Sequence, residues 1–326
     1  MKRSFSLLLL AASWVANAGE DAQLREQAAK LFGRIETVAA ARLDTPQARL
    51  GRALFWDERV SLDGKTACAS CHPANDFGAD RRRFSPDARG EPTSRNSPTI
   101  FNAMALPGLR WLSDRKTGAD QAEGSLTGSL GFKSKDDAVA KLVELKYHDQ
   151  FKAAYPDEAN ALNAKNYGRA LQAYQATLMT PSAFDAFLAG NDRAMTERQK
   201  AGLRAFNAAG CAACHNGPYV GGTQLQKFGL VKDYWTETGT TKPDVGRFSM
   251  TKKDEDKYVF RVPSLRNVAR TAPYFHDGSV DTLDRAVKVM ATVQLGKTLD
   301  DDTVSLITSF LEALTGEVPA HYAPPR

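Results

Sequence analysis

Two short runs, each a cysteine pair followed by histidine, are the residues of this chain that can hold a redox cofactor. Residues 68–72 read C-A-S-C-H, and residues 211–215 read C-A-A-C-H. In a C-x-x-C-H run each cysteine can add to one vinyl group of a porphyrin, and the histidine then reaches the iron as an axial ligand. The sequence therefore predicts two covalently bound haem c groups. The predicted haem-binding residues are Cys68, Cys71, His72, Cys211, Cys214 and His215.

Other uses of paired cysteines stay open at this point. One pair can act as a thioredoxin-like redox centre, two pairs can build a single zinc site, and the four thiols can form disulfides. None of these uses requires a histidine directly after each pair. Because the chain has 4 cysteines and only 5 histidines, the repeated histidine favours haem attachment.

The first eighteen residues predict an export signal. Lys2 and Arg3 are followed by an apolar stretch over residues 7–12, and Ala16-Asn17-Ala18 is typical of a cleavage site. The mature chain would begin near Gly19 and lie in the periplasm, where bacteria attach c-type haem. The alternative is a retained N-terminal anchor. No later stretch is apolar for long enough to span a membrane.

The charge of the chain does not indicate a nucleic-acid partner. The formal net charge is +5, and cleavage after residue 18 would remove Lys2 and Arg3 but no acidic residue, leaving +3. Two haems carry four propionates, so the loaded protein would be close to neutral.

The order helix, turn, motif occurs twice. Pro46 suits the first turn of a helix that reaches Trp56, and an Asp63-Gly64 turn leads into the first motif. A capping box of Thr196 and Gln199 opens a helix that ends at Gly210, directly before the second motif. This repeat predicts a mostly α fold with two cytochrome c-like haem domains and long irregular loops.

The predicted domain boundaries are a signal peptide over 1–18, an N-terminal haem domain over 19–190 and a C-terminal haem domain over 191–326. The domains would be joined near residues 189–192. Further helices are predicted from apolar periodicity and caps. They run from Asp21 to Ala41, from Ser134 with Val139, Leu142 and Val143 buried, from Asn166 with Tyr167, Leu171 and Tyr174 buried, from Thr282, and from Asp300 to Gly316.

Three further runs carry a family resemblance. Residues 95–102 read R-N-S-P-T-I-F-N, residues 262–267 read V-P-S-L-R-N, and residues 271–278 read T-A-P-Y-F-H-D-G. With both C-x-x-C-H motifs, they make the chain similar to the bacterial di-haem cytochrome c peroxidases and their MauG-type relatives. The resemblance extends from about Leu50 to Glu317.

The resemblance assigns different roles to the two haems. The haem on His72 would bind peroxide, and the haem on His215 would transfer electrons with Met290 as its second axial ligand. A thioether ligand favours ferrous iron and so raises the reduction potential. Spacing alone favours Met290 as a core residue of a helix that also carries Leu283 and Val287, and the family resemblance reverses that preference.

Other site residues also come from the resemblance. Trp111 would lie between the haems, either relaying electrons or only packing there, and Gln121 would lie on the peroxide side of the first haem. His276 would act as a propionate or indirect partner rather than an iron ligand. The resemblance also implies a calcium ion between the domains, held by Asn96, Thr271 and Pro273, and suggests a homodimer.

The chain departs from the family pattern in two places. Many of these peroxidases have a histidine in the loop after the first haem that blocks the iron, but residues 73–97 contain none. A first haem that is open without prior reduction is therefore expected. The family's distal glutamate would fall on Gly131, and Glu123 is the nearest candidate replacement. The Asp80-Arg81-Arg82-Arg83 run in this loop is either a docking or propionate-pairing patch or a solvated loop.

Three functions fit these residues. The first is a peroxidase that reduces hydrogen peroxide to water with electrons from a small periplasmic cytochrome c or cupredoxin. The second is a MauG-like oxidase that modifies a partner protein through a high-valent iron state; the missing glutamate favours it, and Met290, where MauG-type enzymes have tyrosine, opposes it. The third is an electron carrier, which needs a sixth ligand for the haem on His72.

Overall fold

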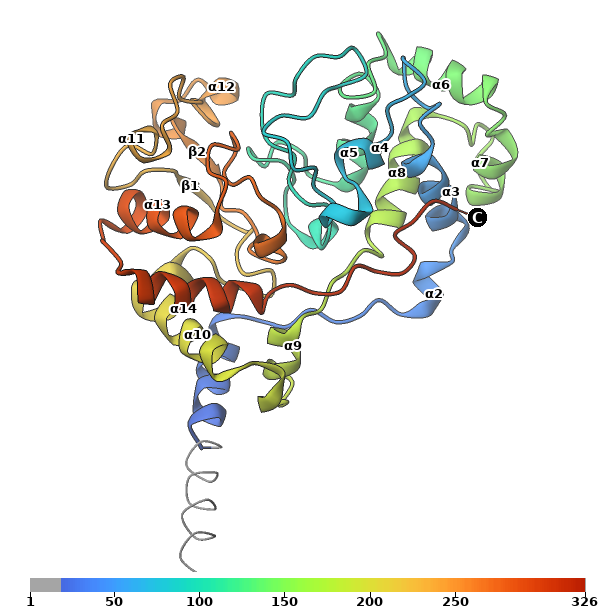
Figure 1. Cartoon of the computed structure of the whole chain (residues 1–326). Helices are drawn as coiled ribbons and strands as arrows, with labels where there is room; N and C mark the ends of the chain where they lie inside the picture. Colours follow the sequence, from blue (N-terminus) through green and yellow to red (C-terminus); the bar gives the residue numbers. More distant parts are fainter. Residues whose placement is uncertain (1–18, 326) are drawn as a thin grey trace, which may run out of the picture.

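The computed structural model of the protein describes residues 19–325, and most of its regular structure is helical (Figure 1). Within that range the sheet consists of two antiparallel strands, β1 (Leu225–Lys227) and β2 (Val259–Arg261). Residues 19–31 are helical, and long irregular segments connect the later elements. The α-helices that follow are α2 (Ala40–Leu43), α3 (Pro46–Trp56), α4 (Cys68–Cys71), α5 (Gly118–Ser125), α6 (Lys135–Glu144), α7 (His148–Ala154), α8 (Ala164–Gln175), α9 (Ala183–Leu188), α10 (Glu197–Ala209), α11 (Trp235–Thr238), α12 (Phe248–Thr251), α13 (Leu283–Leu295) and α14 (Asp301–Glu312).

Helices α3 and α8 form the centre of the first core. Thr45 caps α3 by accepting a hydrogen bond from the Ala48 amide, and Pro46 occupies the first helical position, as predicted. The apolar face of α8, which includes Tyr167, Leu171 and Tyr174, is buried against α3. Helices α5, α6 and α7 complete this half of the molecule.

The second core repeats this packing with α10 and α14. Thr196 and Gln199 form the predicted capping box of α10, and Gly210 ends the helix in a left-handed conformation. Apolar residues of both helices, among them Leu203, Phe206 and Phe310, form the buried cluster between them. The two halves therefore have related packing, which confirms the duplication inferred from the sequence.

A glycine sets the closeness of each helix pair. A Cβ on Gly51 of α3 would collide with the Ala170 carbonyl of α8, four residues before Tyr174. A Cβ on Gly202 of α10 would collide in the same way with the Leu306 carbonyl of α14, four residues before Phe310. At both crossings the backbones approach too closely for any side chain on the glycine.

Both ends of the described chain cross to the opposite half. Leu24 and Phe32, close to the N-terminus, pack in the second core, and so does Phe184 of α9. Tyr322, close to the C-terminus, packs in the first core and donates a hydrogen bond from its hydroxyl to the His72 carbonyl. Figure 1 shows the C-terminal segment running from α14 across to α3. The two cores therefore do not divide the chain at a single residue.

The prediction of one helix from Asp21 to Ala41 is wrong. The helix ends at residue 31, the chain is irregular over residues 32–39, and α2 then begins at Ala40. The Ile35 amide donates to the Asp185 carboxylate at 2.6 Å, and Ile35 itself is buried. This tertiary contact outweighs the helical propensity of the segment.

Two smaller predictions about helices also fail. Asn163, not Asn166, caps α8, while Asn166 is fully buried and donates its amide to the Ala161 carbonyl. On α6 the cap at Ser134 is confirmed. Val143, predicted to be buried, is exposed, and Ala138 is buried together with Leu142.

Substituting the crossing glycines tests the packing of the two cores. Ala in place of Gly gains about 1 kcal/mol in an unhindered helix, but Gly51→Ala and Gly202→Ala are each expected to lose about 1–3 kcal/mol because the backbones must separate. Gly124→Ala in α5 is the matched control, since a Cβ there meets only the end of the Arg115 side chain. Urea unfolding measures all three, and a stabilised Gly51→Ala or Gly202→Ala variant would contradict the close approach.

Candidate haem sites and the cavity between the two halves

A cavity of about 520 Å³ lies between the two cores and is lined by both C-x-x-C-H motifs. This volume is within the range of small-molecule and cofactor sites, about 300–1,000 Å³. The cavity also brings together most of the predicted site residues, which come from distant parts of the sequence. Those that line it are Asn96, Trp111, Gln121, Thr271, Pro273, His276 and Met290, with Cys68, Cys71, His72, Cys211, Cys214 and His215.

The first motif forms a single helical turn, α4, that presents His72 to the cavity. Asp63 organises the predicted turn before it, accepting hydrogen bonds from Ser61 and Thr66. The His72 Nδ1 atom hydrogen-bonds to the Gly78 carbonyl at 2.8 Å, and burial lowers the pKa of the ring. A neutral imidazole that donates from Nδ1 keeps its Nε2 lone pair for a metal.

The second motif is a 3₁₀ turn over Cys211–Ala213 that follows directly on α10. His215 is buried, and burial lowers its pKa to about 4 against smaller opposing effects of the Pro263 and Val220 carbonyls. Gly221 has a φ of +108°, and a Cβ there would lie 2.7 Å from the Pro263 carbonyl oxygen. The backbone therefore closes tightly around a neutral histidine.

No disulfide joins the four cysteines of the two motifs. Burial raises the pKa of Cys68 to about 12 and that of Cys211 to about 11, so both stay protonated at neutral pH. Across residues 19–325, no group of three or more His, Cys, Asp or Glu side chains is arranged to hold a metal ion. The two pairs therefore do not meet in one zinc site, whereas each pair has a histidine beside it at the cavity wall.

Met290 lies on the face of α13 that borders the cavity, together with Leu283 and Val287, as predicted. Thr282 caps this helix by accepting from the Arg285 amide. The thioether of Met290 thus lies in the same cavity as His215. A second methionine, Met104, also lines the cavity and was not predicted; its sulfur packs so closely on Gly118 that a Cβ there would collide with it.

Gln121 faces the cavity from α5, but Glu123 does not. Glu123 instead accepts a hydrogen bond from Lys135 at 2.5 Å. A side chain at Gly131 would meet Ala88 and Leu62, and this residue does not line the cavity either. The cavity wall near Gln121 carries two hydroxyls that sequence reasoning missed, those of Ser125 and Ser129. Ser125 is the last residue of α5 and Ser129 lies in the turn that follows, so their positions depend on how α5 ends.

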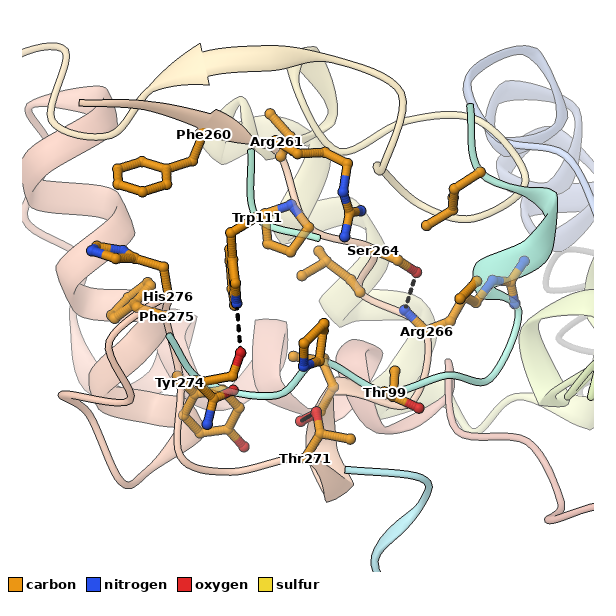
Figure 2. A pocket seen from close by; sticks show the side chains of 18 of the residues that line it. Thr99, Trp111, Phe260, Arg261, Ser264, Arg266, Thr271, Tyr274, Phe275 and His276 are labelled. Atoms are coloured by element: carbon orange, nitrogen blue, oxygen red, sulfur yellow. Dashed lines mark hydrogen bonds between the residues drawn. The ribbon is translucent and has the colours of Figure 1, made fainter. Parts of the chain in front are cut away.

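Trp111 is held by both halves of the molecule (Figure 2). Its indole N–H donates to the Asn96 carbonyl at 2.8 Å, and its own carbonyl accepts from the Arg261 amide at 2.7 Å. The ring meets His276 edge-on at 6.2 Å between centroids, and His276 stacks on Phe260 at 4.1 Å. The indole is therefore fixed within the cavity that contains both motifs.

Asn96, Thr271 and Pro273 all line the cavity, which allows a test of the calcium prediction. The Asn96 amide nitrogen donates to the Arg82 carbonyl, and the Asn96 backbone N–H donates to the His276 carbonyl. These bonds leave the amide oxygen of Asn96 as an acceptor. Neutral amide and carbonyl oxygens are hard ligands that suit Ca²⁺, so the residues present fit this ion.

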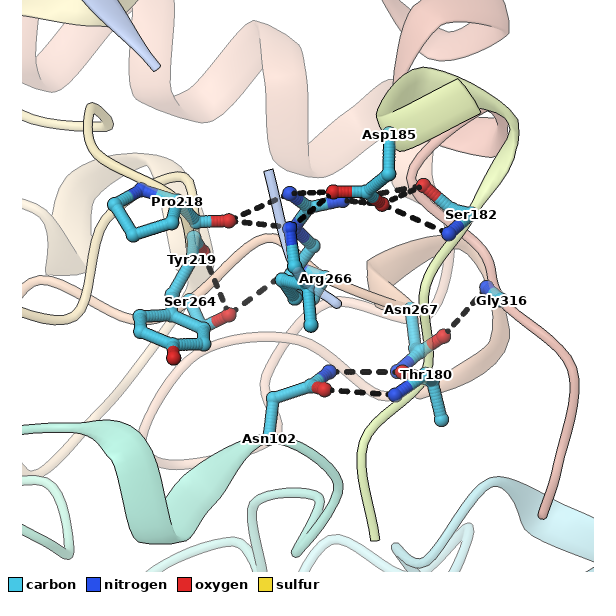
Figure 3. A network of polar contacts seen from close by, with 11 residues as sticks. Asn102, Thr180, Ser182, Asp185, Pro218, Tyr219, Ser264, Arg266, Asn267 and Gly316 are labelled. Atoms are coloured by element: carbon cyan, nitrogen blue, oxygen red, sulfur yellow. Dashed lines mark hydrogen bonds and ion pairs between the residues drawn. The ribbon is translucent and has the colours of Figure 1, made fainter. Parts of the chain in front are cut away.

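A buried polar network joins the segments behind the cavity (Figure 3). Arg266 makes two hydrogen bonds to the Asp185 carboxylate, at 2.6 and 2.9 Å, and its side chain is fully buried. It also donates to the Pro218 carbonyl, close to the second motif. A second chain of bonds connects Asn102 to Thr180, and Thr180 to Asn267.

The chain is similar to known di-haem proteins. A family model described as di-haem cytochrome c peroxidase matches residues 45–193. The cytochrome c551 peroxidase of Pseudomonas aeruginosa is 41% identical over 323 residues, covering 96% of this chain and 92% of that protein. The methylamine utilization protein MauG of Methylophilus methylotrophus is 29% identical over 295 residues, covering 86% and 83%. A solved structure of a MauG-like protein associated with microbial copper homeostasis has a TM-score of 0.75 at 26% identity, covering 90% of this chain and 97% of that one.

Two cytochrome c-like halves that present paired motifs to one cavity define a di-haem redox protein. With these similarities, the chain belongs to the di-haem cytochrome c peroxidase family. It is therefore an oxidoreductase of the peroxidase class with two haem groups, as the sequence predicts. Within residues 19–325 we find no helix with the length and apolar character needed to cross a membrane.

The pH dependence of stability tests the burial of His276. Burial lowers its pKa from 6.5 to about 4, against the opposing charges of Asp277 and Asp244. Because the folded state disfavours the proton, stability falls as pH drops from about 6.5 to about 4, by up to roughly 3 kcal/mol for this residue. His276→Leu is expected to flatten that part of the profile, and His148→Leu, at an exposed site, to leave it unchanged. Chemical unfolding at a series of pH values measures the difference, and parallel profiles for the wild type and His276→Leu would contradict it.

Proposed function

We propose that this protein reduces hydrogen peroxide to water in the periplasm, with electrons from a small cytochrome c or cupredoxin. The overall reaction takes two electrons and two protons per peroxide and yields two waters. The observation that carries the proposal is one cavity lined by both C-x-x-C-H motifs and by Met290. Residues 1–18, the proposed signal peptide, lie outside the described residues.

The cysteine pairs would hold the haems through thioether bonds, and His72 and His215 would be the proximal ligands. When bound, the two haems supply the iron that takes peroxide and the iron that stores an electron. Two features of the chain support iron binding: burial keeps both imidazoles neutral, and the Gly78 carbonyl fixes the orientation of the His72 ring. We propose 19–190 and 191–326 as the two haem domains, with the crossed terminal segments and α9 exchanged between their cores.

The second site would be the electron-transfer site, with Met290 as the second ligand. The placement of Met290 on the cavity face of α13 supports this role. Trp111 would lie on the electron path between the sites, since hydrogen bonds from both halves hold its indole and its carbonyl in place.

The first site would stay accessible to peroxide without prior reduction. No histidine occurs in residues 73–97, and the remaining histidines outside the motifs are engaged elsewhere or exposed. His321 hydrogen-bonds to Thr177, His276 stacks on Phe260, and His148 is on the surface. Gln121 would orient peroxide by hydrogen bonds, with the Ser125 and Ser129 hydroxyls on the same wall. Since none of these groups carries a proton as a carboxylate does, proton delivery would be slower than with a distal acid.

A calcium ion would be held by the Asn96 amide oxygen and by oxygens of Thr271 and Pro273. Such an ion would join a segment of the first half to a segment of the second half at the edge of the cavity. Neutral oxygen ligands imply modest affinity, because the ligand set brings no negative charge. A homodimer stays a prediction from the family resemblance.

A second candidate is a MauG-like oxidase that acts on a partner protein. The observation in its favour is the absence of any Asp or Glu among the described residues that line the cavity, which fits slow turnover of peroxide. Met290 opposes it, because a thioether tunes the second haem towards conventional electron transfer.

Rapid mixing decides between these functions. The oxidised holoprotein is mixed with hydrogen peroxide, with and without a reduced small cytochrome c, and the absorption spectrum is followed. We expect fast oxidation of the donor, two molecules per peroxide, without pre-reduction of the enzyme. A long-lived oxidised species that persists in the presence of the donor would instead establish the oxidase.

The distal residues have a separate test. Gln121→Ala removes the hydrogen-bonding amide from the cavity and is expected to lower kcat/KM for peroxide about tenfold, less than the loss of a full acid–base group. Glu123→Gln is the matched control on the same helix, since Glu123 points to Lys135 and not to the cavity. Steady-state donor oxidation measures both, and a large effect of Glu123→Gln together with no effect of Gln121→Ala would contradict the assignment.

A further inference from the structure

Arg261 is a buried cation without an acidic partner. The residue is 7% exposed and lies at the end of β2, where its side chain lines the cavity (Figure 2). Its Nε atom donates to the Arg110 carbonyl at 2.9 Å, but its Nη1 atom is buried and has no hydrogen-bond partner among the described residues. Burial alone lowers the pKa of the guanidinium to about 10. An uncompensated buried charge of this kind is costly unless a ligand of opposite charge completes it.

The other guanidinium groups at the cavity are already paired. Arg110 is hydrogen-bonded to Asp114 at 2.8 Å, and Arg266 binds Asp185 through two bonds. Within the described chain, no Asp or Glu lines the cavity. Of the three arginines that line the cavity, Arg261 is therefore the one without a carboxylate partner. An anion that neutralises its charge has to belong to a molecule bound in the cavity.

The backbone around Arg261 places it next to the second motif. A Cβ on Gly222 would lie 3.6 Å from the Arg261 Nη1 atom, and a Cβ on the adjacent Gly221 would lie 3.0 Å from the His215 Nδ1 atom. Two residues beyond Arg261, the Pro263 carbonyl also approaches Gly221. The guanidinium and the His215 ring thus both lie against one short glycine segment.

We infer that Arg261 binds a propionate of the haem on His215 and sets the reduction potential of that haem. The inference rests on the proposed function only in requiring a haem at the second motif. A carboxylate is the planar anion that the guanidinium fork binds best, and a haem edge carries two of them. Arg261 donates from its side-chain Nε to the Arg110 carbonyl and from its backbone amide to the Trp111 carbonyl. The same residue would therefore connect the propionate edge to the segment between the two motifs.

The charge of Arg261 would act on the iron through the propionate. With the cation present, the negative charge of the propionate is offset. Without it, the uncompensated carboxylate stabilises ferric over ferrous haem, so the reduction potential falls. We expect the ferric-to-ferrous equilibrium of the second haem to shift about tenfold towards ferric, equivalent to about 59 mV for a one-electron couple.

The experiment is a spectroscopic redox titration of the holoprotein, with haem content measured for every variant. Arg261→Gln and Arg261→Met both remove the charge, and the apolar Met side chain keeps the buried site free of an unpaired polar group. Arg261→Lys keeps the charge but loses the fork. Arg198→Gln is the matched control, because it removes an exposed arginine that bonds only Ser305.

We expect Arg261→Gln and Arg261→Met to lower the potential of the His215 haem, while Arg261→Lys keeps most of it and Arg198→Gln keeps all of it. Unchanged potentials in both neutral variants, a shift confined to the His72 haem, or a shift in Arg261→Lys as large as in Arg261→Gln would overturn the inference. With two haems and donor oxidation retained in the wild type, each of these outcomes leaves the proposed function intact. A wild-type chain with no haem at the second motif would overturn both.

Discussion

The buried ion pair between Arg266 and Asp185 is the interaction that holds α9 and the N-terminal segment to the second half, next to the second motif. Asp185 accepts from Arg266 through both carboxylate oxygens and also from the Ile35 amide and the Ser182 hydroxyl. Arg266 in turn donates to the Pro218 carbonyl. The ion pair therefore connects four segments of the chain, those around Ile35, Asp185, Pro218 and Arg266. Breaking such a pair leaves a buried charge uncompensated, at a cost of about 3–5 kcal/mol.

The packing of the two halves also gives the cavity a positively charged lining. The described residues that line it include Lys227 and three arginines but no carboxylate. The two histidines are held neutral by burial, as a metal ligand requires. The cavity is thus prepared for a cofactor that carries both iron and negative charge. This combination distinguishes the cavity from an apolar ligand pocket. The histidines belong to the C-x-x-C-H motifs, whereas the positive charges come from residues outside them.

The sequence was sufficient for features that depend on local chemistry. The haem motifs, Pro46 in the first turn of α3, the caps of α6, α10 and α13, and the repeated order of helix and motif are short-range patterns, and the structure has each of them. The long helix predicted from Asp21 failed because Ile35 is drawn to Asp185, 150 residues away. Glu123 was proposed because it is close to Gln121 in the sequence, but on a helix two residues apart point to different sides.

The residues that sequence reasoning missed are those whose role depends on what surrounds them. Arg261 is an ordinary basic residue before a V-P-S-L-R-N run, and only its burial without an acidic partner makes it unusual. Ser125 and Ser129 belong to a polar stretch, and their place on the cavity wall depends on how α5 ends. No spacing rule contains this information, because it arises from the closure of the second half on the first.

The crossed termini make the two halves parts of one unit rather than separable modules. The N-terminal segment fills the second core with Leu24 and Phe32, while Tyr322 fills the first core and bonds the His72 carbonyl. A cut near residue 190 would therefore remove buried side chains from both cores and free the backbone that presents His72. This exchange suits a reaction that needs two irons at a fixed separation, because the core beside each motif contains side chains supplied from the other end of the chain.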